Sequence, residues 1–374
     1  MPSEHARYSP SASTRLINCP PSLKLCESIE DKDSPFSLEG TDAHALCEYK
    51  LKKALNLPNQ EAEPELTWYS EEMEECANGY VSFIVELVEE AKKTCNDPIA
   101  LVEQKLDISR YIPNTFGTGD FVLCADGIIH IVDYKHGKGV EVSAEKNTQM
   151  MIYALGSLEI FDCIYDIKKV VMTIYQPRLN NVSTYEMSKE DLLKWAEEIL
   201  VPTSKLALAG KGEFKSGSHC RFCKAKTICR ERARANLELA KNEFKEPPLL
   251  TDDEIEEVLL KIDDLVSWSN DIKDYALQKA IQGKVWCNFK LVEGRSNRKF
   301  TDETAVAKTI EEAGFNPYEQ KLLSMTELQK RIGKSKFYEL VENYIYKPAG
   351  KPTLVPRSDK REEINTAIAD FTDN

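Results

Sequence analysis

The chain has 374 residues, of which 42% are hydrophobic and 30% charged, a composition typical of a soluble globular protein with about two domains. Its net charge of −13 excludes a globally basic nucleic-acid-binding protein, so such a role would have to depend on local basic patches. No apolar run approaches the roughly 20 residues that span a bilayer, and the N-terminal segment has no apolar signal-peptide core. We therefore expect a cytoplasmic protein with no part in a membrane.

The cysteines argue against a disulfide framework, because there are eleven of them and the chain shows no secretory signal. Cys47 and Cys124 lie in apolar periodic segments, where a buried cysteine packs as a small hydrophobic residue. Cys19 follows a short helix that Ser9, Ser11 or Ser13 could cap and that Pro20-Pro21 should end. By itself, this position predicts another core cysteine.

Helices and then a strand are predicted over the next part of the chain. Thr41 is a plausible N-cap of a helix with apolar residues at helical spacing, and His44 shares a face of it with Glu48. A second amphipathic helix covers residues 70–95, and residues 99–108 alternate as a strand. Val102, Gln104 and Leu106 should share one face of that strand, and Glu103 and Lys105 the other. Glu103 is then either a further acid at a site or an exposed strand residue.

The stretch Gly117–Lys135 contains two apolar runs that flank Asp126-Gly127, a strong signal for a two-residue type I′ hairpin turn. Closure at this turn places Asp120 directly opposite Asp133, with Cβ atoms roughly 5 Å apart. Lys135 projects from the same face as Asp133, two residues earlier. Two facing carboxylates and one lysine on an apolar ribbon predict a site for a divalent cation.

A basic loop containing His136 and Lys138 follows; it either contacts phosphates or is simply solvated. Residues 146–161 form a predicted helix with Gln149 and Tyr153 on one face, residues 168–176 a buried strand, and residues 188–208 a helix capped by Ser188. These elements predict a mixed α/β core with helices covering the sheet.

Three cysteines with C-x2-C-x5-C spacing, Cys220, Cys223 and Cys229, occupy a basic stretch after this core. The two-residue gap lets both thiolates of C-x2-C reach one metal. Cys19 is the best candidate for the fourth ligand, and His219 a weaker one because it adjoins Cys220. Ligand type alone leaves both zinc and a [4Fe–4S] cluster open.

The predicted organisation is residues 1–243 as the first domain, 244–250 as a linker and 251–374 as a mainly helical α+β region. In that region we expect a long acidic helix over 251–281, a strand over 285–292, and helices at about 301–314, 325–332 and 335–346. The last segment carries five basic residues, Lys347, Lys351, Arg357, Lys360 and Arg361, which are either a solvated tail or a phosphate-binding one.

Taken together, these residues resemble a known family. G-x-x-D ending in Asp120, then Asp133-Tyr134-Lys135, then Gln149-x-x-x-Tyr153, with His44 on an upstream helix, resembles the RecB-like branch of the PD-(D/E)XK nuclease superfamily. One cysteine before the core and C-x2-C-x5-C after it resemble its iron–sulfur members, the AddB-type helicase-nucleases and the CRISPR-adaptation nucleases. The pattern is also similar to an uncharacterised family encoded by phages and prophages. The resemblance covers about residues 9–235. Val132 replaces the proline of the nominal motif.

The resemblance implies a restriction-endonuclease-like core and a metal-dependent deoxyribonuclease, more specifically an exonuclease for DNA ends in phage recombination, repair or processing. Mg²⁺ or Mn²⁺ would be held by His44, Asp120, Asp133 and the Tyr134 carbonyl, and Lys135 would act on the attacking water or the phosphate. Gln149 and Tyr153 would position the DNA. Cys19, Cys220, Cys223 and Cys229 would hold a structural [4Fe–4S] cluster, with zinc as the alternative. Phage recombination or replication proteins are the expected partners, in the bacterial host cytoplasm. The alternatives are a catalytically silent DNA- or protein-binding scaffold and a zinc-stabilised adaptor.

Overall fold

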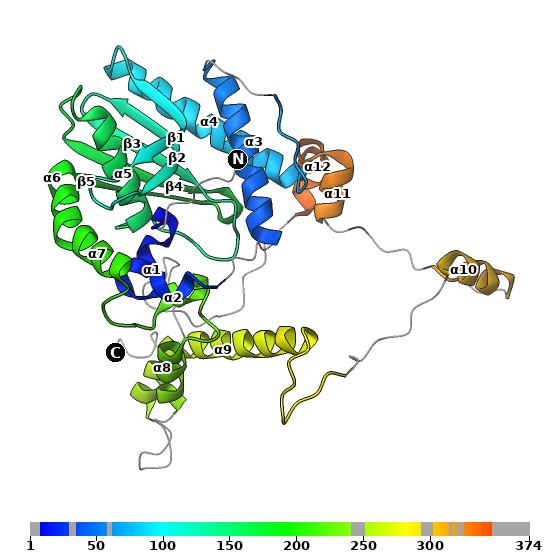
Figure 1. Cartoon of the computed structure of the whole chain (residues 1–374). Helices are drawn as coiled ribbons and strands as arrows, with labels where there is room; N and C mark the ends of the chain where they lie inside the picture. Colours follow the sequence, from blue (N-terminus) through cyan, green and yellow to red (C-terminus); the bar gives the residue numbers. More distant parts are fainter. Residues whose placement is uncertain are drawn as a thin grey trace, which may run out of the picture. The chain divides into compact units, whose positions relative to one another are not determined.

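A computed structural model describes residues 8–29, 35–57, 62–240, 251–292, 302–313, 316–318, 323 and 325–345. The chain divides into two compact units, residues 1–276 and 277–374, which are described separately here (Figure 1). Helix α9 (Asp252–Ile281) contributes its first 25 residues, up to Ala276, to the first unit. The predicted linker, residues 244–250, lies outside the described residues.

The N-terminal part of the first unit is helical. A 3₁₀ turn (Pro10–Ala12) leads into α1 (Ser13–Asn18) and α2 (Ser22–Cys26), and two long helices follow, α3 (Pro35–Ala54) and α4 (Glu71–Thr94). Ser70 caps α4, as its oxygen accepts a hydrogen bond from the Met73 amide. The predicted N-cap at Thr41 is wrong, because α3 begins earlier and Thr41 donates a hydrogen bond to the Ser37 carbonyl one turn before it.

Five strands form one mixed sheet in the order β1-β2-β3-β4-β5: β1 (Ile99–Asp107), β2 (Phe116–Ala125), β3 (Ile128–Tyr134), β4 (Lys169–Gln176) and β5 (Asn181–Ser188). All neighbours are antiparallel except β3 and β4, which α5 (Thr148–Phe161) connects as a crossover. The edge strand β5 was not predicted. The available signal was the alternation of Tyr185 and Met187 with polar residues shortly after Asn180.

The hairpin of β2 and β3 has the predicted register. Asp126 and Gly127 both have positive φ, 48° and 74°, as a type I′ turn requires. The paired residues run from Ala125 opposite Ile128 to Phe121 opposite Val132. Asp120 and Asp133 are the next positions along the two strands, so the predicted alignment of the two acids is confirmed.

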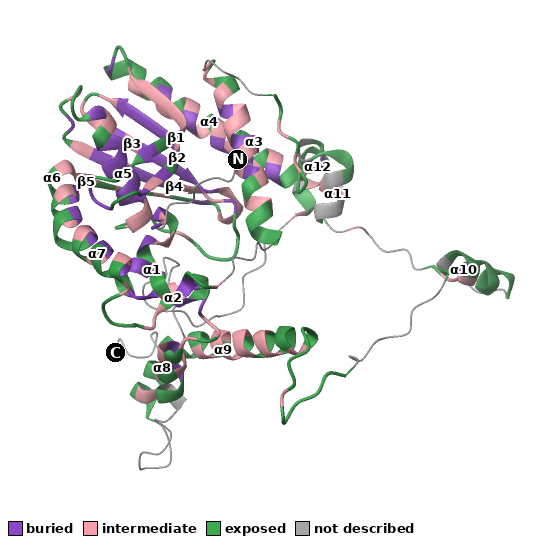
Figure 2. Cartoon of the chain, viewed as in Figure 1, coloured by how far each residue is buried: buried purple, intermediate pink, exposed green. Residues whose placement is uncertain are grey.

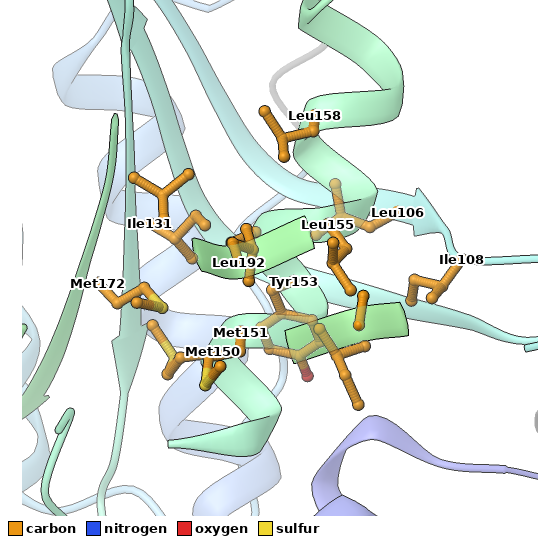
Figure 3. Close-up of a cluster of buried hydrophobic side chains, with 14 of the residues drawn as sticks. Leu106, Ile108, Ile131, Met150, Met151, Tyr153, Leu155, Leu158, Met172 and Leu192 are labelled. Carbon is orange, nitrogen blue, oxygen red and sulfur yellow. The ribbon is translucent and has the colours of Figure 1, made fainter. Parts of the chain in front are cut away.

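Helices cover both faces of the sheet with apolar cores. On one side, α5, α1 and the helical stretch α6 (Lys189–Trp195), a π-helical turn (Ala196–Leu200) and α7 (Val201–Ala209) pack on the strands. Figure 3 shows Met150 and Met151 of α5 near Met172 of β4, and Leu155 of α5 near Leu106 of β1. On the other side, α3 and α4 pack on the sheet through buried residues that include Tyr80 and Tyr134. Buried residues accordingly concentrate in the strands and α5 (Figure 2).

Strand β1 departs from the predicted alternation. Val102 packs in the core under α3 and α4, whereas Leu106 packs in the core under α5. Two residues separated by an even number should share a face, so the alternation reverses between them. Glu103 has a φ of 51°, in the left-handed region that non-glycine residues rarely adopt, and this residue turns the strand over. The expectation that Val102 and Leu106 share a face is therefore wrong.

The remaining described elements are helical. In the first unit, β4 and β5 are joined by a 3₁₀ turn (Pro177–Leu179), and a 3₁₀ segment (Ser218–Phe222) and α8 (Arg230–Ala240) follow α7. The second unit contains α10 (Glu303–Glu312), α11 (Met325–Ile332), α12 (Lys334–Val341) and a 3₁₀ turn (Glu342–Tyr344), close to the predicted helices. The predicted strand over 285–292 is wrong, because only an isolated bridge joins Trp286 and Phe289. The basic residues of the last segment lie outside the described residues. None of the described helices combines the length and apolar character needed to cross a membrane.

Candidate functional site

Two acids come from adjacent strands of the hairpin, Asp120 from β2 and Asp133 from β3, and Asp133 lies on the side of the sheet that α5 covers. Asp133 alternates with Ile131, which packs under α5, and the Asp133 side chain is only 3% exposed. Asp120 is fixed by the hairpin itself, because the Tyr134 amide donates a hydrogen bond to its Oδ2 at 2.7 Å. The expected role of the Tyr134 carbonyl as a metal ligand stays a prediction.

A histidine from α3 and an acid from β1 complete a group around Asp120. His44 Nδ1 lies 3.5 Å from Asp120 Oδ2. One potential ligand atom from each of His44, Glu103 and Asp120 lies within 4.8 Å of the other two, and no other such group occurs among the described residues. The reversal of β1 at Glu103 accompanies this arrangement, and of the two alternatives left open by the sequence it favours Glu103 as a further acid beside His44 and Asp120. Two carboxylates and one imidazole suit Mn²⁺ or Mg²⁺.

Lys135, Gln149 and Tyr153 form the other half of the site, around Asp133. Lys135 Nζ lies 2.7 Å from Asp133 Oδ2 and forms a buried ion pair with it. Gln149 donates through Nε2 to Asp133 Oδ1 at 3.3 Å and to the Tyr153 hydroxyl at 3.0 Å. Every predicted residue of the acidic site is therefore brought together.

The charges of the site shift the pKa values of its members. Burial raises the pKa of Asp133, and the Lys135 ammonium opposes this rise only in part. Burial acts the same way on Asp120, yet His44 and Lys135 outweigh it and hold the Asp120 pKa below its usual range. Burial and the Asp120 charge raise the pKa of Glu103 to about 8. Burial alone would lower the His44 pKa, but Asp120 raises it to about 9.

The helix that carries His44 is anchored to the sheet by a buried network that sequence reasoning missed. Arg178 follows β4 and donates 2.9 Å hydrogen bonds to Glu39 of α3 and Glu72 of α4. His136 Nε2 lies 3.5 Å from the same Glu39 carboxylate, and His136 Nδ1 is hydrogen-bonded to the Tyr134 hydroxyl at 2.9 Å. The His136 side chain is 3% exposed, so its predicted place in a solvated or phosphate-binding loop is wrong.

The four predicted cysteines, Cys19, Cys220, Cys223 and Cys229, line one pocket in the first unit. Arg15 and Lys215 line it too, as do Lys226 and Arg232, which both form ion pairs with Asp271. Burial raises the pKa values of Cys19 and Cys220, but hydrogen bonds from His219, a backbone amide and a serine, together with the His219 charge, outweigh it and lower both. His219 is therefore a hydrogen-bond partner of both thiols in this structure.

The sulfur spacing bears on what the pocket can hold. Tetrahedral zinc with Zn–S bonds of about 2.3 Å requires sulfurs roughly 3.8 Å apart. No three of the four cysteine sulfurs lie within 4.8 Å of one another, so the sulfurs are farther apart than the ligands of a single zinc ion. A further thiol, Cys26 of α2, lies 3.7 Å from Cys223 but does not line the pocket. Sequence reasoning did not single out Cys26.

Helix α1 connects the pocket to the acidic site. Cys19 ends α1, and the side chains of Ser13 and Thr14 are hydrogen-bonded to the Thr148 hydroxyl at 2.7 and 2.8 Å. Thr148 directly precedes Gln149, which contacts Asp133. The N-terminal segment thus joins the start of α5 to the cysteine pocket.

Comparison with known proteins identifies the family. Residues 5–362 match DUF2800, described as a protein of unknown function. The chain belongs to this family. Among solved structures, the crystal structure of SSO0001 is 12% identical, and the match covers 58% of this chain and 96% of that one. Its TM-score is 0.22, so this likeness carries no argument about fold or function.

Proposed function

We propose that this DUF2800 protein is a divalent-metal-dependent deoxyribonuclease. The observation that carries the proposal is the convergence of His44, Glu103 and Asp120, within 4.8 Å of one another, beside the buried pair of Asp133 and Lys135. Four structural elements, α3, β1, β2 and β3, must pack together to assemble these residues. Such an assembly of acids is costly unless a cation binds there.

The proposal includes a PD-(D/E)XK core of the RecB-like branch. Its support is the pattern of residues on the sheet: an acid on β2, a second acid and a lysine at the end of β3, and a glutamine and a tyrosine on the crossover helix α5. The mixed sheet, with three antiparallel strands followed by a parallel one, agrees with that core.

The donor set fits a hard divalent cation, because it offers carboxylate oxygens and an imidazole. His44, Asp120 and Asp133 would hold the ion, with Glu103 as an additional acid. When bound, the ion supplies Lewis-acid polarisation of a phosphate and a lowered pKa for water.

The residues around this position have separate roles. Lys135 keeps a positive charge beside Asp133, where it orients an attacking water or stabilises the negative charge that develops on the phosphate. Gln149 is hydrogen-bonded to both Asp133 and Tyr153, so it fixes the acid and presents the tyrosine hydroxyl to the DNA strand. Buried Arg178 holds α3, and with it His44, against the sheet.

For the cysteine pocket we propose a structural [4Fe–4S] cluster, with zinc as the alternative. The support is the set of four cysteines in one pocket, spaced more widely than a single zinc ion needs. Bound metal would fasten α1 to the segment after α7 and contribute folding energy. The proposed setting is phage DNA recombination, repair or processing in a bacterial host, with DNA ends as substrate and recombination or replication proteins as partners.

The test is a cleavage assay on anaerobically purified protein. End-labelled single- and double-stranded DNA is incubated with Mn²⁺, Mg²⁺ or EDTA, alongside the Asp133→Ala variant. We expect metal-dependent cleavage that the variant loses, and the product ladders then distinguish exonuclease from endonuclease. Absence of cleavage of every substrate, with the cysteine centre intact, would refute the nuclease and favour a binding scaffold.

A further inference from the structure

The segment around the C-x2-C motif is basic in an otherwise acidic chain. Residues 211–234 contain eight lysines and arginines against two glutamates, whereas the whole chain carries −13. This segment forms much of the wall of the cysteine pocket. A local reversal of charge of this size indicates an anionic partner.

Part of this charge is used within the fold. Arg232 and Lys226 pair with Asp271 at 2.6 and 2.7 Å, and Arg234 pairs with two glutamates of its own helix. The cations that are exposed and form no ion pair with another described residue are Lys211, Lys215, Arg221 and Arg230. These side chains are available to a partner.

The C-x2-C motif itself presents an arginine and a phenylalanine to solvent. Cys220 and Cys223 are 9% and 8% exposed because both thiols turn into the pocket. The 3₁₀ segment between them leaves the Phe222 ring 76% exposed, and Arg221 beside it is exposed as well. Phe214 is 45% exposed at the edge of the pocket, next to Lys215.

We propose that this surface, defined as Phe214, Lys215, Arg221 and Phe222, binds single-stranded nucleic acid. Exposed aromatic rings stack on bases, and neighbouring cations contact phosphates, the combination that sequence-tolerant single-strand binding uses. A duplex keeps its base faces stacked inside, so the exposed rings favour an unpaired strand. The proposal rests on the proposed function, whose substrate class it narrows to single strands or frayed ends.

The experiment measures binding without cleavage. Fluorescence anisotropy of labelled oligothymidine, and of its duplex with oligoadenosine, is recorded with full-length Asp133→Ala protein whose cysteine-bound metal content is verified. Phe222→Leu removes the ring but keeps an apolar side chain, and Arg221→Gln removes one charge. Phe289→Ala is the matched control, because Phe289 is 80% exposed in the second unit.

Phe222→Leu should weaken oligothymidine binding by roughly tenfold and leave duplex binding within about twofold, and Phe222→Trp should restore it. Arg221→Gln should lower the slope of log affinity against log salt by about 1. If Phe222→Leu binds oligothymidine as tightly as the Phe289→Ala control does, the proposal is overturned. A polypeptide then becomes the next partner to test on this surface. If Phe222→Leu weakens the binding of single strand and duplex equally, stacking of Phe222 on bases is ruled out. If wild-type protein fails to cleave DNA but Phe222→Leu still weakens binding, the proposed function falls and this surface stands.

Discussion

Metal binding at the acidic site should depend steeply on pH, because the raised pKa values of two proposed ligands predict that both hold protons at neutral pH. His44 must be neutral to ligate an ion, and its pKa is raised to about 9. Glu103 must be ionised, and its pKa is raised to about 8. A proton competes with the ion at each group, so the affinity falls as the pH drops below each pKa.

The size of the effect follows from these two values. Each group costs a factor of about ten in apparent affinity for every pH unit below its pKa. Between pH 7 and pH 9 the His44 proton accounts for roughly 50-fold and the Glu103 proton for roughly tenfold, so the affinity for Ca²⁺ should rise roughly 500-fold. Glu103→Gln should reduce the rise to roughly 50-fold, because only the histidine proton remains to be displaced.

Isothermal titration calorimetry without DNA measures this directly. Titrations at pH 7 in two buffers with different ionisation enthalpies should show about two protons released per Ca²⁺, and about one for Glu103→Gln. Glu186→Gln is the control, since Glu186 is an exposed acid paired with Lys169 on the edge of the sheet. An affinity that stays constant from pH 7 to pH 9 would show that neither group is a ligand.

Three further predictions test individual contacts. Lys135→Met should abolish cleavage and lower the free energy of unfolding by roughly 3 kcal/mol, because the buried Asp133 carboxylate loses its counter-charge. The double variant with Asp133→Asn should regain most of the stability measured by urea denaturation but should not regain cleavage. Purified Cys223→Ser should lack the absorbance near 400 nm expected of the cluster, whereas Cys26→Ser should keep it, and loss in both variants would place Cys26 among the ligands. Gly117→Ala should destabilise the protein by about 1–3 kcal/mol and reduce cleavage, since its methyl would lie 2.7 Å from the ring of Tyr153; unchanged thermal melting and activity would contradict this.

Local sequence determined the central hairpin and the helix that faces it. Asp126-Gly127 fixes a two-residue turn, and the turn fixes the register that aligns Asp120 with Asp133. The spacing of Gln149 and Tyr153 in the same way fixes their common face on α5. These features were predictable because each depends on residues close together in the chain.

Tertiary structure alone decided which distant groups join them. The resemblance, and no local pattern, suggested His44; packing of α3 on the sheet through Arg178 places it at Asp120. Glu103 lies beside His44 and Asp120 where the alternation of β1 reverses, and the positive φ of this residue could not be predicted from the sequence around it. Cys26 meets Cys223 across 197 positions of sequence. Turn and helix periodicities act over a few residues, whereas these contacts depend on how whole elements pack. The sequence by itself therefore determined the hairpin and the helix face, and only the packed core determined the complete candidate site.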